Sequence, residues 1–258
     1  MTGRRSFLQQ SLLMATQSWL IVSGLKARAF EPGMKAVIED WLRKTVALHR
    51  GLRGGGLSPT AWRRAMDELF RKVGLETLVQ GLDLNRFIDK QRPTDNLAVI
   101  QNIPLPEVAG LAPMPAFGHK IFVLRRGGAI IPHAHNDMVS AHLVVKGRFH
   151  VRTFNRRFEK ETEPGFLALE PSLDRIFGPG EVITMADDYD NVHWLVATTD
   201  TAVTFDIPVT ALGSGRSYPN PANRYSMIFV DPLFGIRDDG LLRGRILDFD
   251  GAVRQFAG

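Results

Sequence analysis

Short apolar runs divided by turn residues fill the chain from about residue 119 to residue 209, and they constrain its fold more than any other feature. Within each run, valine, isoleucine, phenylalanine and threonine favour alternate positions, which is the period of a strand with one buried face. The segments between the runs contain the glycine, proline, asparagine and aspartate of turns. The pattern predicts an all-β sandwich or barrel with strands at 119–124, 141–154, 165–169, 182–185, 192–197 and 202–209.

A helical period precedes these runs. From Pro32 onward, apolar residues recur at intervals of three and four, which is the spacing of one helix face, until the glycine-rich segment at 50–56 interrupts it. Ser58 and Pro59 then offer an N-cap and a first-turn proline for a second helix. A shorter helical stretch is expected at 75–89, so the β region should carry a helical N-terminal layer.

The first 29 residues have the three parts of an export signal, with cleavage expected after Ala29. The pattern Arg4-Arg5-x-Phe7-Leu8 resembles the twin-arginine signal, whose pathway moves folded proteins, and an ordinary secretory signal is the alternative. The apolar stretch ends at Leu25 and falls short of the roughly 20 residues that cross a bilayer, so no stable membrane anchor is expected. The predicted organisation is a signal at 1–29, a helical segment at 30–115 and a β-barrel domain at 116–258.

Charge and cysteine content narrow the function further. The whole chain carries a net charge of +5, but removal of the signal leaves 28 basic and 27 acidic residues, so a nucleic-acid role is not indicated. The sequence contains no cysteine, so any metal ligands must be nitrogen or oxygen atoms. The expected location is the bacterial periplasm or the exterior, with the twin-arginine translocase as the partner during export.

Four of the seven histidines lie in the stretch IIPHAHNDMVSAHLVVKGRFHVRTFN, at positions 133, 135, 142 and 150. If this segment is extended, His133 and His135 point to the same side and present two imidazoles to one point, as a metal site requires. His142 could begin the next strand and face the same point. Such pairs also arise by chance, so this pattern alone leaves metal binding and a half-solvated polar sheet both open.

The wider spacing resembles a known family. The pattern G-x5-H-x-H-x4-S-x6-G, from Gly127 to Gly147, follows the first motif of the cupin superfamily, with Ser140 where that motif has glutamate. The stretch GPGEVITMADDYDNVHWLVA corresponds to the second motif, since it supplies a turn, a strand and then His193. His193 is therefore the candidate for a third ligand from the far side of the barrel.

Within the cupins, the chain resembles the thiol dioxygenases that include cysteamine dioxygenase and the plant cysteine oxidases. FVLRRGGAIIPHAHNDMVSAHLVVKGRFHVRTF follows their first motif, and NVHWLVATT corresponds to their N-I-H-x-F-x-A-x-T, over about residues 122–207. The resemblance implies a mainly β cupin double-stranded β-helix barrel. It also implies one Fe(II) per chain, held without a carboxylate by His133, His135 and His193. A doubly charged ion with three neutral ligands would attract a thiolate and leave positions for dioxygen.

Some positions depart from the family pattern. The family's Pro-x-Met-Thr after the histidine pair is not kept in the stretch that contains Asp137-Met138-Val139, and Asp137 could be a partner of a ligand, a fourth ligand or a turn residue. His142 replaces a residue that is not a ligand, and it could be a pocket acid or base or a core histidine bonded to backbone. Asp206 resembles an acidic residue near the family's pocket, so His142 and Asp206 are the candidate catalytic residues. His150 is expected to lie outside the metal set.

Three functions agree with these patterns. The first is an exported iron dioxygenase acting on a small thiol or related sulfur compound and O2. The second is a cupin that uses its metal as a Lewis acid, as an isomerase or lyase would, and the third is a periplasmic module that binds a small ligand without turnover. Cupin folds host many chemistries, so the fold cannot choose among them.

Overall fold

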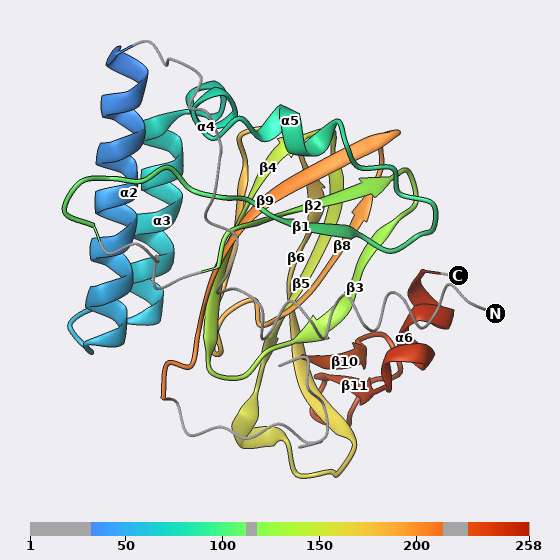
Figure 1. The fold of residues 1–258 in the computed structure, drawn as a ribbon. Helices are drawn as coiled ribbons and strands as arrows, with labels where there is room; N and C mark the ends of the chain where they lie inside the picture. The colour runs from blue at the N-terminus through green and yellow to red at the C-terminus, as the bar shows by residue number, and fades with distance from the viewer. Residues whose placement is uncertain (1–31, 112–117, 214–226, 258) are drawn as a thin grey trace. The chain divides into compact units, whose positions relative to one another are not determined.

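The computed structural model describes residues 32–111, 118–213 and 227–257, so the predicted export signal lies outside the described residues. Two sheets face each other (Figure 1). A five-stranded sheet has the order β1-β2-β9-β4-β7, and a second sheet closes on itself in the order β10-β11-β6-β5-β8-β3. The strands are β1 (Val99–Asn102), β2 (Lys120–Arg125), β3 (Ala129–Ala134), β4 (Met138–Lys146), β5 (Phe149–Arg156), β6 (Phe166–Phe177), β7 (Val182–Met185), β8 (Val192–Ala197), β9 (Thr201–Thr210), β10 (Ile228–Asp231) and β11 (Leu242–Ile246).

Alternation along the strands of the five-stranded sheet separates two cores. On β9, Phe205 points to the helices and packs against Trp41 and Phe70, with ring centroids 6.4 Å away in both cases. The residues on either side of it, Thr204 and Asp206, point to the opposite face of the sheet because side chains alternate along a strand. That inner face meets the second sheet, and an apolar cluster with Phe149 and Leu195 fills the space between the sheets.

Four helices build the layer that covers the outer face of the five-stranded sheet. The serine at position 58 caps the second of them as predicted, since its hydroxyl accepts a hydrogen bond from the Ala61 N–H at 3.2 Å. The apolar face of that helix is buried at Trp62, Met66 and Phe70. The helices are α2 (Pro32–Arg53), α3 (Pro59–Val73), α4 (Leu75–Gly81) and α5 (Leu84–Ile88).

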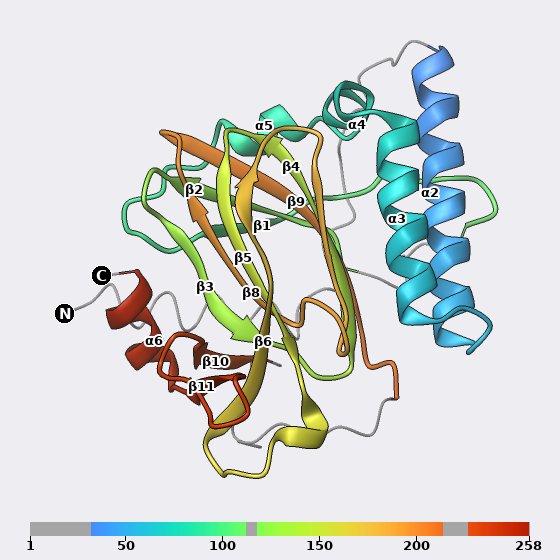
Figure 2. The same ribbon diagram turned by 180° about the vertical axis from the view of Figure 1, so that it is seen from behind.

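The last helix, α6 (Phe249–Phe256), covers the second sheet instead. It packs against β3 and β10, and its Phe256 and Phe249 rings lie 5.1 Å and 5.3 Å from those of Trp194 and Phe229. Figure 2 shows the same arrangement from behind, with α2 and α3 on one side and α6 on the other. A short 3-10 helix, η1 (Phe158–Lys160), lies between β5 and β6.

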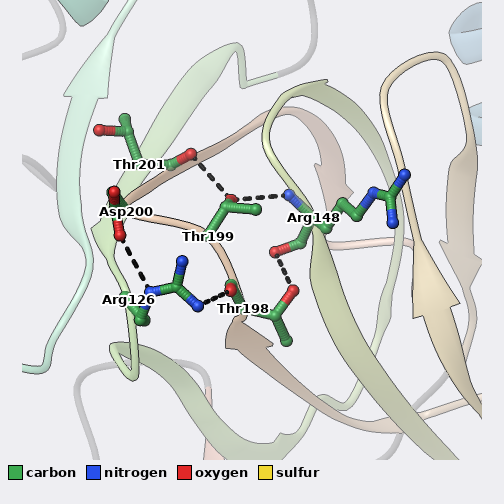
Figure 3. A network of polar contacts seen from close by, with 6 residues as sticks. All are labelled: Arg126, Arg148, Thr198, Thr199, Asp200 and Thr201. Atoms are coloured by element: carbon green, nitrogen blue, oxygen red, sulfur yellow. Dashed lines mark hydrogen bonds and ion pairs between the residues drawn. The ribbon is translucent and has the colours of Figure 1, made fainter.

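A polar network joins three turns at one end of the strands (Figure 3). Arg126 donates to the Asp200 carboxylate at 2.9 Å and to the Thr198 carbonyl at 2.6 Å. The backbone N–H of Arg148 donates to the Thr199 hydroxyl at 3.0 Å, and the Thr198 hydroxyl returns a bond to the Arg148 carbonyl. These contacts tie together the turns that precede β3, β5 and β9, at the ends of β3 and β8 that lie away from His133 and His193.

Two further observations bear on the predicted organisation. The sheet already includes Val99–Asn102, which pairs with β2 ahead of the boundary expected at residue 116. Within the described ranges, no helix has the length and apolar character needed to cross a membrane.

Candidate metal centre

The three histidines predicted as ligands lie together between the sheets. His133 on β3 and His193 on β8 are direct cross-strand partners, and His135 follows one residue after β3 ends. The ring centroid of His133 lies 4.2 Å from that of His193 and 4.7 Å from that of His135. One nitrogen from each ring falls within 4.8 Å of the others, so the three side chains could hold one metal ion.

Backbone carbonyls fix the orientation of two of these rings. The Nδ1 atom of His133 lies 2.8 Å from the Ile131 carbonyl oxygen, and that of His193 lies 3.1 Å from the Asn191 carbonyl oxygen. A carbonyl oxygen can only accept a hydrogen bond, so both Nδ1 atoms carry the proton and both Nε2 atoms keep a lone pair. Hydrogen bonds of this kind orient metal-binding histidines in proteins. The donor set therefore fits a divalent metal ion.

Burial keeps the imidazoles of His133 and His193 neutral. Loss of solvent around His133 lowers its pKa to about 4, against a smaller opposing effect of its hydrogen bond to Ile131. Burial also lowers the pKa of His193 well below its ordinary value, and the charges of His133, His135 and His142 add to this effect. Neutral imidazoles are the form that binds metal, so protons do not compete for these two rings near pH 7.

The loop that carries His135 is held by three side chains. Asn191 donates through its amide nitrogen to the His135 carbonyl at 2.7 Å, Arg156 donates to the Asn136 side chain at 2.8 Å, and the Asp187 carboxylate accepts from the backbone N–H groups of Asp137 and Met138. Asp137 itself adopts a left-handed conformation with φ of 65°. This places Asp137 in a turn, one of the three roles considered for it.

Both candidate catalytic residues lie on the inner face of the five-stranded sheet. His142 on β4 and Asp206 on β9 are cross-strand partners, with the His142 Nε2 atom 3.4 Å from an Asp206 carboxylate oxygen. The Nδ1 atom of His142 lies 3.2 Å from the Thr204 hydroxyl, so its partners are side chains rather than backbone. Its ring centroid is 6.2 Å from that of His193. The pair is buried beside the three-histidine cluster.

Carboxylates do not join the cluster itself. Among the residues that the structure describes, the group with metal-ligand spacing contains only the three histidines. Ser140 stands where the cupin motif has glutamate, and its hydroxyl donates a hydrogen bond to the Asp206 carboxylate. The Asp206 carboxylate is thus engaged by Ser140 and lies beside His142 on the opposite wall.

The fourth histidine of the stretch at 130–155 lies elsewhere. His150 is half-buried on β5 and is hydrogen-bonded to Asp174 on β6, which confirms that it stands outside the group with ligand spacing. Asn191 is the first residue of the motif NVHWLVATT, and no sequence signal pointed to Arg156 or Asp187. These three residues act through backbone and amide contacts across the fold, which a linear pattern does not encode.

Comparisons with known proteins find similar solved structures but no matching family. No family model and no curated protein matches the chain. Similar solved structures include oxalate oxidase in complex with glycolate (16% identity over 59% of this chain and 65% of that chain, TM-score 0.35) and a cupin superfamily protein from Desulfitobacterium hafniense (9%, 46% and 84%, TM-score 0.31). The chain spans only 22% of procruciferin, an 11S globulin from Brassica napus (12% identity over 38% of this chain, TM-score 0.31).

The topology on its own confirms the predicted fold class. The protein is mainly β, with two facing sheets that form a double-stranded β-helix barrel and with helices layered on its N-terminal side. Similarities of the size found here say nothing about the reaction. The chemical conclusions therefore rest on the site.

Proposed function

We propose that the protein is a mononuclear non-haem iron dioxygenase that oxidises a small thiol or related sulfur compound with O2. The observation that carries the proposal is the cluster of three imidazoles, two buried and one half-buried, with no carboxylate among its members in the described part of the chain. Such a donor set adds no negative charge to the metal. An anionic thiolate is therefore attracted to the ion more strongly than it would be to a carboxylate-bearing site.

His133, His135 and His193 would hold the iron. Bound iron(II) would supply the one-electron chemistry that lets dioxygen react with the sulfur, so that both oxygen atoms reach the product. The chain's own part is to hold two Nε2 lone pairs inward through the Ile131 and Asn191 carbonyls and to surround the site with buried side chains. His142 would exchange a proton with the substrate, while Asp206 and Thr204 hold its ring in place.

Oxygen uptake tests the proposal. Protein purified without oxygen and loaded with iron(II) is expected to consume O2 when a small thiol is added, and to consume none with enediols. A panel of thiols and enediols, followed with an oxygen electrode, makes the comparison. Absence of bound iron together with absence of uptake for every compound would refute the dioxygenase assignment.

A second candidate is a metal-dependent isomerase or lyase without redox chemistry. The observation that favours it is the buried His142 and Asp206 pair, which could act as an acid and base beside a Lewis-acid metal. Turnover by the zinc-loaded protein in the absence of oxygen would support this candidate.

In the dioxygenase, by contrast, Asp206→Asn should leave iron content unchanged and lower the oxygen-uptake rate by about a hundredfold or more.

We also propose that the protein works outside the cytoplasm, after export by the twin-arginine translocase. The support is the Arg4-Arg5-x-Phe7-Leu8 pattern, together with the advantage of loading iron where copper and zinc are scarce. Replacement of both arginines by lysine should keep the precursor in the cytoplasm. Unchanged export of that variant would point to an ordinary secretory signal.

A further inference from the structure

A row of three polar side chains crosses the inner face of the five-stranded sheet. Lys120 at the start of β2 pairs with Asp206 on β9, and Asp206 pairs in turn with His142 on β4. Cross-strand partners point to the same face, so Lys120 faces the interior together with the two candidate catalytic residues. Neither the cupin spacing nor the histidine pattern draws attention to this lysine.

The Lys120 ammonium group has hydrogen-bonding capacity to spare. Its Nζ atom lies 3.8 Å from the nearer Asp206 oxygen, which is beyond hydrogen-bond distance, and 5.2 Å from the centroid of the Phe122 ring. In the part of the chain that the structure describes, it donates no hydrogen bond to a protein acceptor. An ammonium group offers three N–H donors, and the Lys120 side chain keeps 30% of its surface exposed. A small molecule could therefore reach these donors.

The row that begins at Lys120 leads to the candidate ligands. Asp206 lies between Lys120 and His142 across the strands, and the His142 ring centroid is 6.2 Å from that of the candidate ligand His193. An anion that contacts both Lys120 and a metal ion at the cluster would interact with positive charge at both ends.

The simpler role for Lys120 is to neutralise Asp206. That carboxylate is already hydrogen-bonded to Ser140 and lies beside His142, so the 3.8 Å approach of the ammonium adds no hydrogen bond to it. A group that served only as a counter-ion would gain more from direct contact. The geometry instead leaves the ammonium donors available to a ligand.

We propose that Lys120 binds a carboxylate of the substrate, so that the enzyme prefers small carboxylated thiols over neutral or cationic ones. This inference rests on the proposed function, because the substrate's sulfur is taken to lie at the three-histidine cluster. Lys120 is then a specificity-determining residue. Its role is to bind the end of the substrate that does not react.

Ligand binding without turnover tests the proposal. Protein loaded with nickel(II), in the absence of oxygen, is titrated calorimetrically with 3-mercaptopropionate, 2-mercaptoethanol, cysteamine and the thiol-free acid propionate. Lys120→Met should weaken the binding of 3-mercaptopropionate and of propionate by about tenfold or more, because a charged hydrogen bond is lost. It should change the affinity for the other two compounds by less than about twofold. Lys120→Arg should retain most of the affinity. Lys44→Met serves as the matched control, because Lys44 pairs with Asp40 on the exposed face of α2.

Each result has a distinct meaning. If Lys120→Met weakened the binding of all four compounds equally, the proposal would be overturned, since the residue would then have a general structural role. No change with any of them would overturn it as well. If propionate binding depends on Lys120 but 3-mercaptopropionate binds no more tightly than propionate, the carboxylate site stands and the thiol dioxygenase assignment fails.

Discussion

At the scale of single residues, Asn191 connects two of the candidate ligands. Its main-chain carbonyl accepts from His193, and its side-chain amide donates to the carbonyls of His135 and Ala186, at 2.7 Å and 3.3 Å. One residue therefore helps to place two of the three candidate ligands, one in the loop after β3 and one on β8. Its contribution acts through their positions and not through contact with the metal.

Replacement of Asn191 by alanine should weaken iron(II) binding by about 10- to 100-fold, as is usual when a group that orients metal ligands is lost. The side-chain donor disappears, so the His135 carbonyl and the loop that carries it lose their anchor. Affinity is measured by anaerobic titration with a competing chelator, alongside the circular dichroism of the fold. Asn96→Ala is the control, because Asn96 accepts a hydrogen bond from Arg125 away from the site. Wild-type affinity in Asn191→Ala would contradict this positioning role.

At the scale of structural elements, the two glycines of the first cupin motif differ in why glycine is needed. Gly127 and Gly147 both adopt positive φ, 78° and 68°, which disfavours any other residue. At Gly127 an added Cβ atom would meet no atom within 4 Å. At Gly147 it would lie 2.2 Å from the Thr201 carbonyl oxygen and 2.3 Å from the Thr199 hydroxyl, inside the polar network of Figure 3.

Alanine substitutions should separate these two effects. Gly127→Ala should lower the free energy of unfolding by about 1 kcal/mol through backbone strain alone. Gly147→Ala adds an overlap with backbone atoms that cannot move away freely. Its loss of unfolding free energy should therefore exceed that of Gly127→Ala by roughly 2 kcal/mol or more. Urea denaturation of both variants gives the comparison. Equal losses would show that the tight turn relaxes around the added methyl group.

The elements also show how far sequence reasoning reaches. The predicted strands at 182–185 and 192–197 coincide with β7 and β8, because alternation and clear turn residues bound both. The strands β1, β3, β10 and β11 were missed, and the strand predicted at 141–154 is two strands, β4 and β5. The missed strands have four to six residues each, and β3 and β10 are buried at every position, so none shows a two-residue period of polarity. β6 extends well beyond 165–169 because pairing with β5 holds its polar half in the sheet.

At the scale of the whole molecule, buried histidines should make stability depend on pH. His49 on α2 is the clearest case away from the site: burial lowers its pKa to about 4, and its ring lies edge-on to Trp62. Its stabilising neutral form is fully favoured above the unfolded pKa of 6.5. As pH falls from 6.5 towards 4, the unfolded chain takes up a proton that the folded protein does not, so stability is lost.

Metal-free wild-type protein should therefore lose about 3 kcal/mol more of its unfolding free energy between pH 7 and pH 4 than His49→Gln does. The other buried histidines contribute equally to both proteins and cancel in the comparison. Urea titrations at the two pH values measure the difference. Parallel losses in the two proteins would mean that His49 titrates normally in the fold.

The site as a whole was predictable only in part. The spacing and the family resemblance named three histidines that the fold does bring together, although His193 lies 58 positions beyond His135. The row formed by Lys120, Asp206 and His142 depends on the register of three strands that are far apart in the chain. No local sequence pattern indicates such a register, so the complete set of residues in this row could be identified only from the structure.

Anaerobic iron(II) titration tests the central claim most directly. Wild-type protein and His150→Ala should each bind one iron(II) ion per chain, because His150 is engaged with Asp174 outside the cluster. His133→Ala, His135→Ala and His193→Ala should each abolish binding while the protein remains folded. Equal loss of iron in all four variants, or retained binding in all four, would show that these three histidines are not the metal site.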